Sequence, residues 1–260
     1  MLTEWALYLT APAPIAFRRL GYVRESVSLY SRSRRCRSAW RPHLDATRAV
    51  IREALAGLAQ RRTAIVLGSG LLDDIPLAAL AGAFEHVRLV DAVHLWPARM
   101  VASRYRNVER VSLDIGGTAR MLLEGTSEPE DTLTAICARA DVDLVISANL
   151  LSQLPILPLD WYDSRGRPEP PALARSIVAA HVDALTRTRA RVCLITDVVE
   201  RELDRNGREL DRLDLLHGHE LPPADRVWDW DLAPFGEAEP GRRLVHRVQA
   251  YPDWHRALSI

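Results

Sequence analysis

The residues best suited to chemistry follow two short apolar runs. The run Thr63 to Leu67 leads directly into Gly68-Ser69-Gly70 and a helix start. Glycines at such a junction let a ligand approach the main chain closely. A second run ends about twenty residues later in Asp91, whose carboxylate is placed to accept both hydroxyls of a ribose. Together these features predict a site for an adenosine-bearing cofactor.

Composition sets the broad class. The 260 residues, 48% of them hydrophobic, can bury a full core. Formal net charge is zero, all 34 basic residues are arginine, and arginine dominates the first 62 residues. A GC-rich genome and a preference for guanidinium chemistry both explain this usage. Cys36, Cys137 and Cys193 have neither metal nor disulfide spacing. With no secretory or membrane-spanning run, we expect buried thiols in a cytoplasmic protein.

The spacing of apolar residues predicts an α/β fold. Residues 1 to 62 have helical periodicity, clearest over 15–30 and over 41–60, where Pro42 suits a first turn. From residue 63, strands and helices alternate, which is typical of a parallel sheet covered on both faces. The predicted strands lie near 63–68, 87–91, 108–113, 142–147 and 191–196, and the predicted helices near 73–83, 94–105, 130–139 and 171–189.

The pattern changes after Asp197. The charged segment from Glu200 to Asp214 is interpreted as a solvated helix or lid. The run 226–231 alternates between polar and apolar residues, and the run 243–251 is a second strand candidate. Pro, Gly and Glu separate the two runs, so they predict an antiparallel terminal hairpin. We therefore expect a helical cap segment over residues 1–62 and one sheet domain over residues 63–260.

This order of elements, over roughly residues 60 to 255, resembles the class I methyltransferases that use S-adenosylmethionine. Their first strand carries an acidic-x-Gly-x-Gly-x-Gly motif, which falls here on Val66 to Leu72. Two of the glycines match. Val66 stands at the position of the acid, and Leu72 at the position of the third glycine. Asp73 or Asp74 is the candidate substitute for the acid in holding the amino group of the cofactor. The resemblance implies a Rossmann-like, seven-stranded, mostly parallel sheet with an antiparallel C-terminal hairpin and helices on both faces.

The resemblance also implies roles for residues after the strands. Asp91 matches the ribose-binding acid, and Asp114-Ile115 the pair beside the adenine. The segment 147–155 falls where the family lines the boundary between cofactor and acceptor, and it lacks the Asp/Asn-Pro-Pro-Tyr/Phe motif of amino-directed base methylators. Asn149 is expected near the methyl group. The expected cofactor-binding set is Gly68, Ser69, Gly70, Asp91, Ala92, Asp114, Ile115, Asn149 and Leu150.

A dinucleotide is the competing cofactor. The dehydrogenase motif Gly-x-Gly-x-x-Gly would place its third glycine at Asp73. A carboxylate there hinders close packing of helix on strand and puts negative charge near a pyrophosphate. A sulfonium cofactor has no phosphate to repel, so this position favours S-adenosylmethionine.

Methyl transfer needs alignment of the nucleophile and exclusion of water more than a catalytic group. For a hydroxyl or protonated amine acceptor, a base near the methyl would take a proton, and His94 and His181 are the candidates. A structural role is the alternative for each. The pair His217 and His219 lacks further spaced ligands, so no metal site is predicted.

The arginine cluster from Arg32 to Arg41 is the main candidate for acceptor binding. It could hold the carboxylate of a small acidic acceptor or, as the alternative, the phosphates of RNA. Aromatic residues after the fourth strand could stack on an acceptor or anchor a loop. A cofactor-binding scaffold without catalysis is a third interpretation. The expected acceptor-side residues are Arg34, Arg35, Arg37, Trp40, His43, Gln153, Trp161 and Tyr162.

Overall fold

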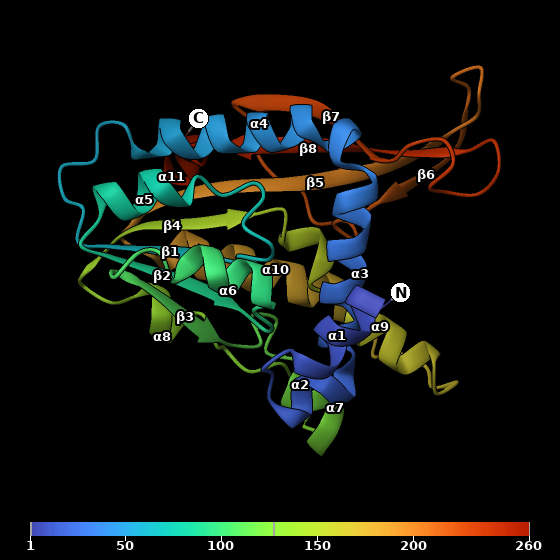
Figure 1. Cartoon of the computed structure of the whole chain (residues 1–260), viewed down its shortest axis with the longest axis horizontal. Coiled ribbons are helices and arrows are strands. Elements are labelled where there is room, and N and C mark those ends of the chain that lie inside the picture. The colour runs from blue at the N-terminus through green and yellow to red at the C-terminus, as the bar shows by residue number, and fades with distance from the viewer. Residues whose placement is uncertain (1, 127, 260) are drawn as a thin grey trace.

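The fold is built on one eight-stranded sheet with strand order β3-β2-β1-β4-β5-β8-β7, and β6 pairs with β5 outside this order. The computed structural model describes residues 2–126 and 128–259 (Figure 1). The first five strands are mutually parallel. They are β1 (Thr63–Leu67), β2 (His86–Asp91), β3 (Val108–Ser112), β4 (Val142–Ala148) and β5 (Arg191–Leu203).

The C-terminal strands run antiparallel to this set. Strand β8 (Arg243–Tyr251) lies between β5 and β7 (Arg226–Ala233) and pairs antiparallel with both. The mostly parallel sheet with an antiparallel C-terminal hairpin is therefore confirmed. The strand count of seven is wrong, because β6 adds an eighth strand.

The charged segment 200–214 is neither a helix nor a lid. Strand β5 continues to Leu203 and folds back into β6 (Glu209–Asp214), which pairs antiparallel with it. The turn is closed by Asp204, whose Oδ1 accepts the backbone N–H groups of Asn206 and Arg208. Every residue of β6 is exposed. The ribbon thus lies in water, which is why its sequence carries charges in place of the apolar alternation of a core strand.

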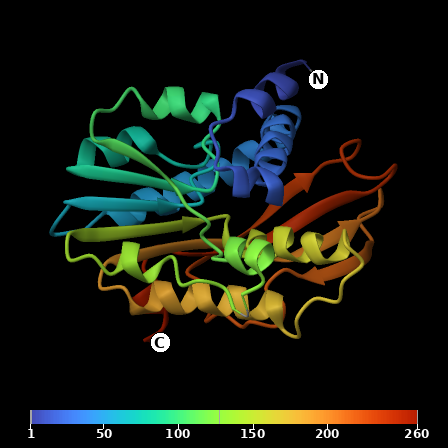
Figure 2. The same ribbon diagram turned by 90° about the horizontal axis from the view of Figure 1, so that it is seen from below.

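Helices cover both faces of the sheet (Figure 2). One face packs against α4 (Arg37–Leu55), α5 (Leu77–Ala83) and α6 (Trp96–Ala102), and the other against α8 (Thr134–Cys137), α10 (Leu173–Arg187) and α11 (Trp254–Ala257). In β1, Ala64 and Val66 join the first core, whereas Ile65 and Leu67 join the second. This alternation explains why the parallel strands are apolar on both sides.

The N-terminal segment is divided between two places. Gly21, with φ 95°, separates α2 (Ile15–Leu20) from α3 (Tyr22–Arg35), so the helix expected over 15–30 is two helices. Helices α1 (Leu2–Thr10) and α3 pack on Ala92 and Val93, just after β2. Helix α4 instead lies on β4, β5 and β7. The expected cap over residues 1–62 therefore excludes α4, which belongs to the layer over the sheet.

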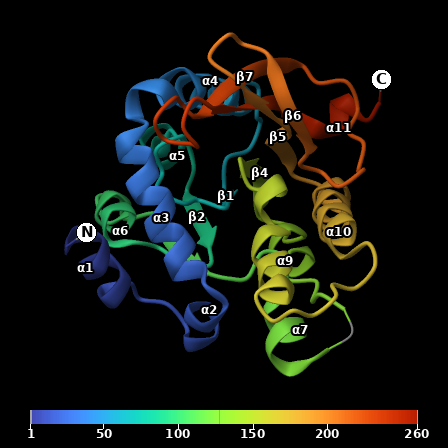
Figure 3. The same cartoon turned by 90° about the vertical axis from the view of Figure 1, so that its right-hand side faces the viewer.

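Two details of the helix prediction are corrected. Pro42 lies inside α4 and not in its first turn, because the helix begins at Arg37. Trp161 and Tyr162 lie on α9 (Ile156–Asp163) and not on a loop. The connection beyond β3 forms α7 (Ala119–Glu124) (Figure 3), and the one beyond β4 forms the 3-10 helix η1 (Leu151–Gln153).

The expected buried thiols are confirmed: Cys36, Cys137 and Cys193 are all buried and free. Across residues 2–126 and 128–259, none of the helices combines the length and apolar character that crossing a membrane requires.

Candidate functional site

The candidate site lies where the parallel strands end, which we call the carboxyl edge. The glycine turn after β1 meets Asp91 at the end of β2, because parallel strands end on the same edge of a sheet. Asp91 Oδ2 accepts the Gly70 backbone N–H at 2.7 Å, and Oδ1 accepts that of Val93 at 3.2 Å. Burial raises the pKa of Asp91, while these two N–H groups stabilise its charged form. The carboxylate is thus held in one orientation beside the turn.

The two positions of the turn require glycine for different structural reasons. Gly68 has φ 67°, and a Cβ built there would lie 2.9 Å from Leu150 Cδ1. Gly70 has φ 49°, and a Cβ there would meet only the Gly68 carbonyl at 3.7 Å. Gly68 is therefore required by the close packing of Leu150, and Gly70 by its backbone conformation alone. Leu72, at the position of the missing third glycine, keeps a left-handed φ of 65°.

Asn149 connects the end of β4 to the glycine turn. Its backbone N–H donates to the Ile195 carbonyl at 2.8 Å, and its Nδ2 donates to Asp74 Oδ2 at 2.7 Å. Burial raises the pKa of Asp74 to about 6, although the bond from Asn149 works in the opposite direction. Asn149 Oδ1 and Ser69 Oγ are buried without a hydrogen-bond partner among the described residues. Such atoms normally have a partner, so both fit a bound polar ligand.

A second carboxylate follows the end of β3. Asp114 is buried; its Oδ1 accepts the Tyr22 hydroxyl at 2.8 Å, and its Oδ2 accepts the Ala119 N–H at 2.6 Å. Burial raises the pKa of Asp114 and, together with the Asp114 charge, the pKa of Tyr22. Tyr22 is a residue that the sequence analysis did not identify. The two residues are separated by 92 positions, and no local pattern links them.

The remaining predicted cofactor residues lie at the same edge but are mostly covered. Ala92 is 7% exposed and packs among residues of α1 and α3, and Ile115 is 8% exposed and packs in the core on the α10 face. Leu150 packs on Gly68. The structure therefore brings together all nine predicted positions around the ends of β1 to β4, with Asp91, Asp114, Ser69 and Asn149 supplying the polar atoms.

The two candidate bases have structural surroundings. His94 is 3% exposed, and its Nε2 donates to the Val111 carbonyl at 3.1 Å. His181 is 2% exposed, and its Nε2 lies 3.0 Å from Ser147 Oγ. Burial lowers the pKa of both, that of His181 to about 4. The bond to Val111 and the burial account for the His94 imidazole without a catalytic role, whereas His181 Nδ1 is buried without a hydrogen-bond partner among the described residues.

Two of the expected acceptor-side residues belong to the core. Trp40 is 3% exposed and donates from Nε1 to the Leu232 carbonyl at 2.9 Å. The His43 ring stacks on Trp230 at 4.0 Å and accepts a hydrogen bond from Trp228. Burial lowers the pKa of His43 to about 3. Both residues fasten α4 to β7, and this packing role explains their burial without an acceptor.

The arginine cluster lies on helices and not on a segment between them. Arg34 and Arg35 are in the last turn of α3, and Arg37 is the first residue of α4. Arg35 pairs with Glu237 at 2.6 Å, and Arg32 lies 3.8 Å from the same carboxylate. The Arg34 guanidinium lies 5.6 Å from the centre of the Tyr30 ring. Part of the cluster therefore joins α3 to the β7–β8 connection.

The acceptor-side residues after β4 also make local contacts. Gln153 is exposed and donates to the Asn149 carbonyl at 2.7 Å. Trp161 and Tyr162 pack against a buried cluster that includes Leu20 and Met121, with their rings 5.0 Å apart. The anchoring interpretation explains both aromatics.

A buried polar network between the paired strands β5 and β8 had no signal in the sequence. Asp197 accepts hydrogen bonds from Ser152 and from His246 Nδ1, and His246 Nε2 lies 2.8 Å from Glu200. Burial alone would lower the pKa of His246, but the two carboxylates raise it to about 9. His246 is therefore an imidazolium at neutral pH and fastens β8 to β5.

The chain was compared with protein-family models, curated proteins and solved structures. Neither protein-family models nor curated proteins give a match. Among solved structures, the N-methyltransferase NodS from Bradyrhizobium japonicum WM9 with S-adenosyl-L-homocysteine has 13% identity and a TM-score of 0.36, over 79% of this chain and 85% of that one. The 1,6-didemethyltoxoflavin-N1-methyltransferase from Burkholderia thailandensis has 16% identity and a TM-score of 0.40, over 93% and 92%.

Proposed function

We propose that this chain binds S-adenosylmethionine at the carboxyl edge and transfers its methyl group to a small-molecule acceptor. The observation that carries the proposal is the chemistry of the polar atoms there. Asp74, Asp91 and Asp114 supply carboxylates, and Asn149 Oδ1 and Ser69 Oγ are buried without partners among the described residues. These groups suit a ligand that is cationic and carries hydroxyl and amino donors.

The same atoms argue against a pyrophosphate-bearing cofactor. Carboxylates beside the glycine turn would repel phosphate oxygens, and Asp73 stands where a dinucleotide motif needs glycine. A ribose would instead donate its hydroxyls to Asp91, whose orientation Gly70 and Val93 fix. Asp114 would accept from an exocyclic amino group through the remaining lone pairs of its two oxygens, each of which has one donor within the chain.

When bound, S-adenosylmethionine supplies a methyl group already activated by its sulfonium charge. The chain's own part is to orient the cofactor and to exclude water. Helices α1 and α3 exclude water, because they pack on Ala92 and Val93 directly beside Asp91. A general base is not required for this role, which agrees with the structural surroundings of His94 and His181.

The structure weakens the reasons for an acidic or RNA acceptor. Both rested on the arginine cluster, in which Arg35 pairs with Glu237 and Arg32 lies near it. Trp40 and His43 beside it are in the core. We therefore propose a small-molecule acceptor without assigning it a charge.

Calorimetry with S-adenosylmethionine, S-adenosylhomocysteine and NAD tests the proposal. The first two should bind, and Asp91→Asn should weaken them by about 1.5–3 kcal/mol through lost charge-assisted hydrogen bonds. Asp229→Asn is the control, since Asp229 is a carboxylate on β7 that pairs with Arg201 and Arg247. Binding of NAD alone would overturn the proposal, and equal affinity for the Asp91 variant would reject the ribose assignment.

A further inference from the structure

The opposite end of the sheet, where the parallel strands begin, is lined with arginine. We call it the amino edge. A cavity of about 800 Å³ opens there between the connections that enter β1, β4 and β5, and a second of about 370 Å³ lies at the starts of β2 and β3. Both are lined by Arg139. β1 has five residues, so at a rise of about 3.3 Å per residue this edge lies about 16 Å from the glycine turn.

The two cavities together are lined by seven arginines and three carboxylates. The arginines are Arg62, Arg88, Arg106, Arg139, Arg187, Arg189 and Arg191, and the acids are Glu109, Asp141 and Asp143. Seven positive and three negative charges leave an excess of four in the lining. Asp183 and Asp253, outside the lining, each pair with one arginine. The larger cavity has no aromatic side chain in its lining, and the smaller one has the imidazole of His86.

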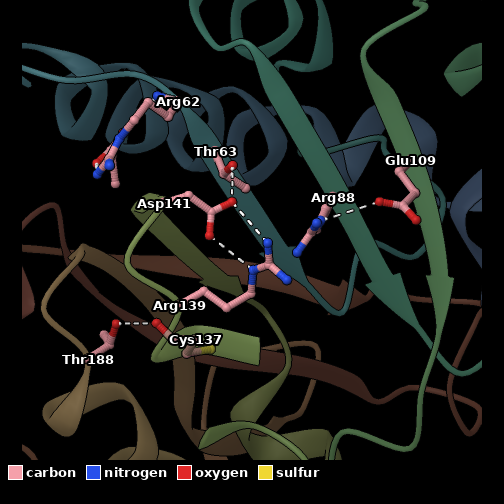
Figure 4. A network of polar contacts seen from close by, with 9 residues as sticks. Arg62, Thr63, Arg88, Glu109, Cys137, Arg139, Asp141 and Thr188 are labelled. Atoms are coloured by element: carbon pink, nitrogen blue, oxygen red, sulfur yellow. Dashed lines mark hydrogen bonds and ion pairs between the residues drawn. The ribbon is translucent and has the colours of Figure 1, made fainter. Parts of the chain in front are cut away.

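The carboxylates serve to fix arginines in place (Figure 4). Asp143 accepts the backbone N–H of Arg62 at 2.7 Å and two guanidinium bonds from the same residue, which lower its pKa. Asp141 accepts from Arg139 at 3.0 Å and from the Thr63 hydroxyl at 3.2 Å, and its pKa falls to about 2. Both acids are ionised at neutral pH, and their carboxylate oxygens already accept hydrogen bonds from groups of this chain.

The walls of the larger cavity are also tied together. Thr188 Oγ1 donates to the Cys137 carbonyl at 2.8 Å, which joins the connection before β5 to the one before β4. Arg191 donates from NH1 to the Ala56 carbonyl at 2.8 Å, which joins β5 to the segment before β1. A fixed frame lowers the entropic cost of binding a ligand.

Three guanidinium groups of the two cavities remain available, two in the larger cavity and that of Arg106 in the smaller one. Arg106 and Arg189 have no ion pair in the described part of the chain, residues 2–126 and 128–259. Arg187 pairs with Asp183 at 3.5 Å, with both side chains more than 60% exposed. An exposed pair of this kind contributes little and is readily exchanged for a better anion.

We infer that the amino edge binds a small phosphorylated molecule through its phosphate oxygens. Guanidinium groups match phosphate in shape and charge, and the larger cavity has the volume of a small-molecule site. A single-stranded nucleic acid is disfavoured in the larger cavity, because no ring in its lining can stack on the bases. The inference concerns a site separate from the carboxyl edge and does not depend on the proposed methyl transfer.

Calorimetry with inorganic pyrophosphate at physiological salt tests this inference. Wild type should bind saturably, and the double variant Arg187→Ala/Arg189→Ala should bind at least about tenfold more weakly, because it loses two charge-assisted donors. The control Arg205→Ala/Arg208→Ala removes the same charge from two exposed positions in the β5–β6 turn and should bind like wild type. S-adenosylmethionine binding should be unchanged in both variants, which separates this test from that of the proposed function.

Three results would overturn the inference. The first is the absence of saturable pyrophosphate binding to wild type. The second is an equal loss in both double variants, which would mean non-specific attraction to charge. The third comes from fluorescence anisotropy with a labelled RNA oligonucleotide: RNA binding that Arg187→Ala/Arg189→Ala abolishes and pyrophosphate does not displace would assign the edge to a nucleic acid.

Discussion

The Tyr22 hydroxyl donates to Asp114 Oδ1 at 2.8 Å, so a hydrogen bond joins the first residue of α3 to the segment that follows β3. The Tyr22 ring also packs against Phe17 in α2 at 5.4 Å. The N-terminal helices are thereby fastened to the carboxyl edge by a polar bond as well as by apolar packing on Ala92. The N-terminal helices therefore form a layer against this edge of the sheet.

The first prediction concerns this bond. Tyr22→Phe keeps the ring and removes the donor, so a buried carboxylate loses one partner. We expect the free energy of unfolding in urea to fall by about 1–3 kcal/mol. Tyr8→Phe is the control, because it is the same change on α1 and the Tyr8 side chain is 37% exposed. Similar small losses in both variants would show that the bond contributes nothing specific.

The second prediction separates the two glycines of the turn. Gly70→Ala should cost about 1–2 kcal/mol, since only a left-handed backbone opposes it. Gly68→Ala should cost about 1–3 kcal/mol more, because its Cβ would lie 2.9 Å from Leu150. Urea unfolding measures both. Equal losses would contradict the assignment of Gly68 to packing.

The third prediction concerns pH. Asp197 and Glu200 raise the pKa of His246 to about 9. A raised histidine pKa means that the folded state holds the proton more tightly. The stabilisation is therefore complete below the ordinary pKa of 6.5 and is lost as pH rises toward 9. The expected decrease is about 3 kcal/mol.

Urea unfolding between pH 6 and about 9.5 tests this dependence. His246→Gln should flatten the profile over that window, whereas His86→Gln, a change at an exposed position on β2, should leave it unchanged. A wild-type profile without a slope in this range would rule out a charged His246 in the fold.

The fourth prediction distinguishes core from substrate contact in α4. Trp40→Ala should lower the free energy of unfolding by about 3–5 kcal/mol, because it empties a buried site against Trp230. Arg37→Ala, an exposed change three residues earlier, should shift it by at most about 0.5 kcal/mol. If Trp40→Ala leaves the free energy of unfolding unchanged, the core role of Trp40 is contradicted, and acceptor binding becomes its expected role again.

Much of the fold was predictable because its signals are local. The five parallel strands are short apolar runs, and their observed starts differ from the predicted ones by at most one residue, as with His86 against the expected 87. β6 was missed because all its residues are exposed, so no apolar alternation marks it. The Asn206-Gly207 pair was its one local signal, a typical hairpin turn.

The sequence by itself determined which strands end in a glycine turn, in Asp91 and shortly before Asp114, since alternation and turn residues act over a few positions. Only the tertiary structure decided that Tyr22 caps Asp114, that His43 and Trp40 are core residues, and that seven arginines gather at one edge. Those outcomes depend on which elements become neighbours in space. That choice is made by packing across the whole chain, where a residue's partner can lie 92 positions away.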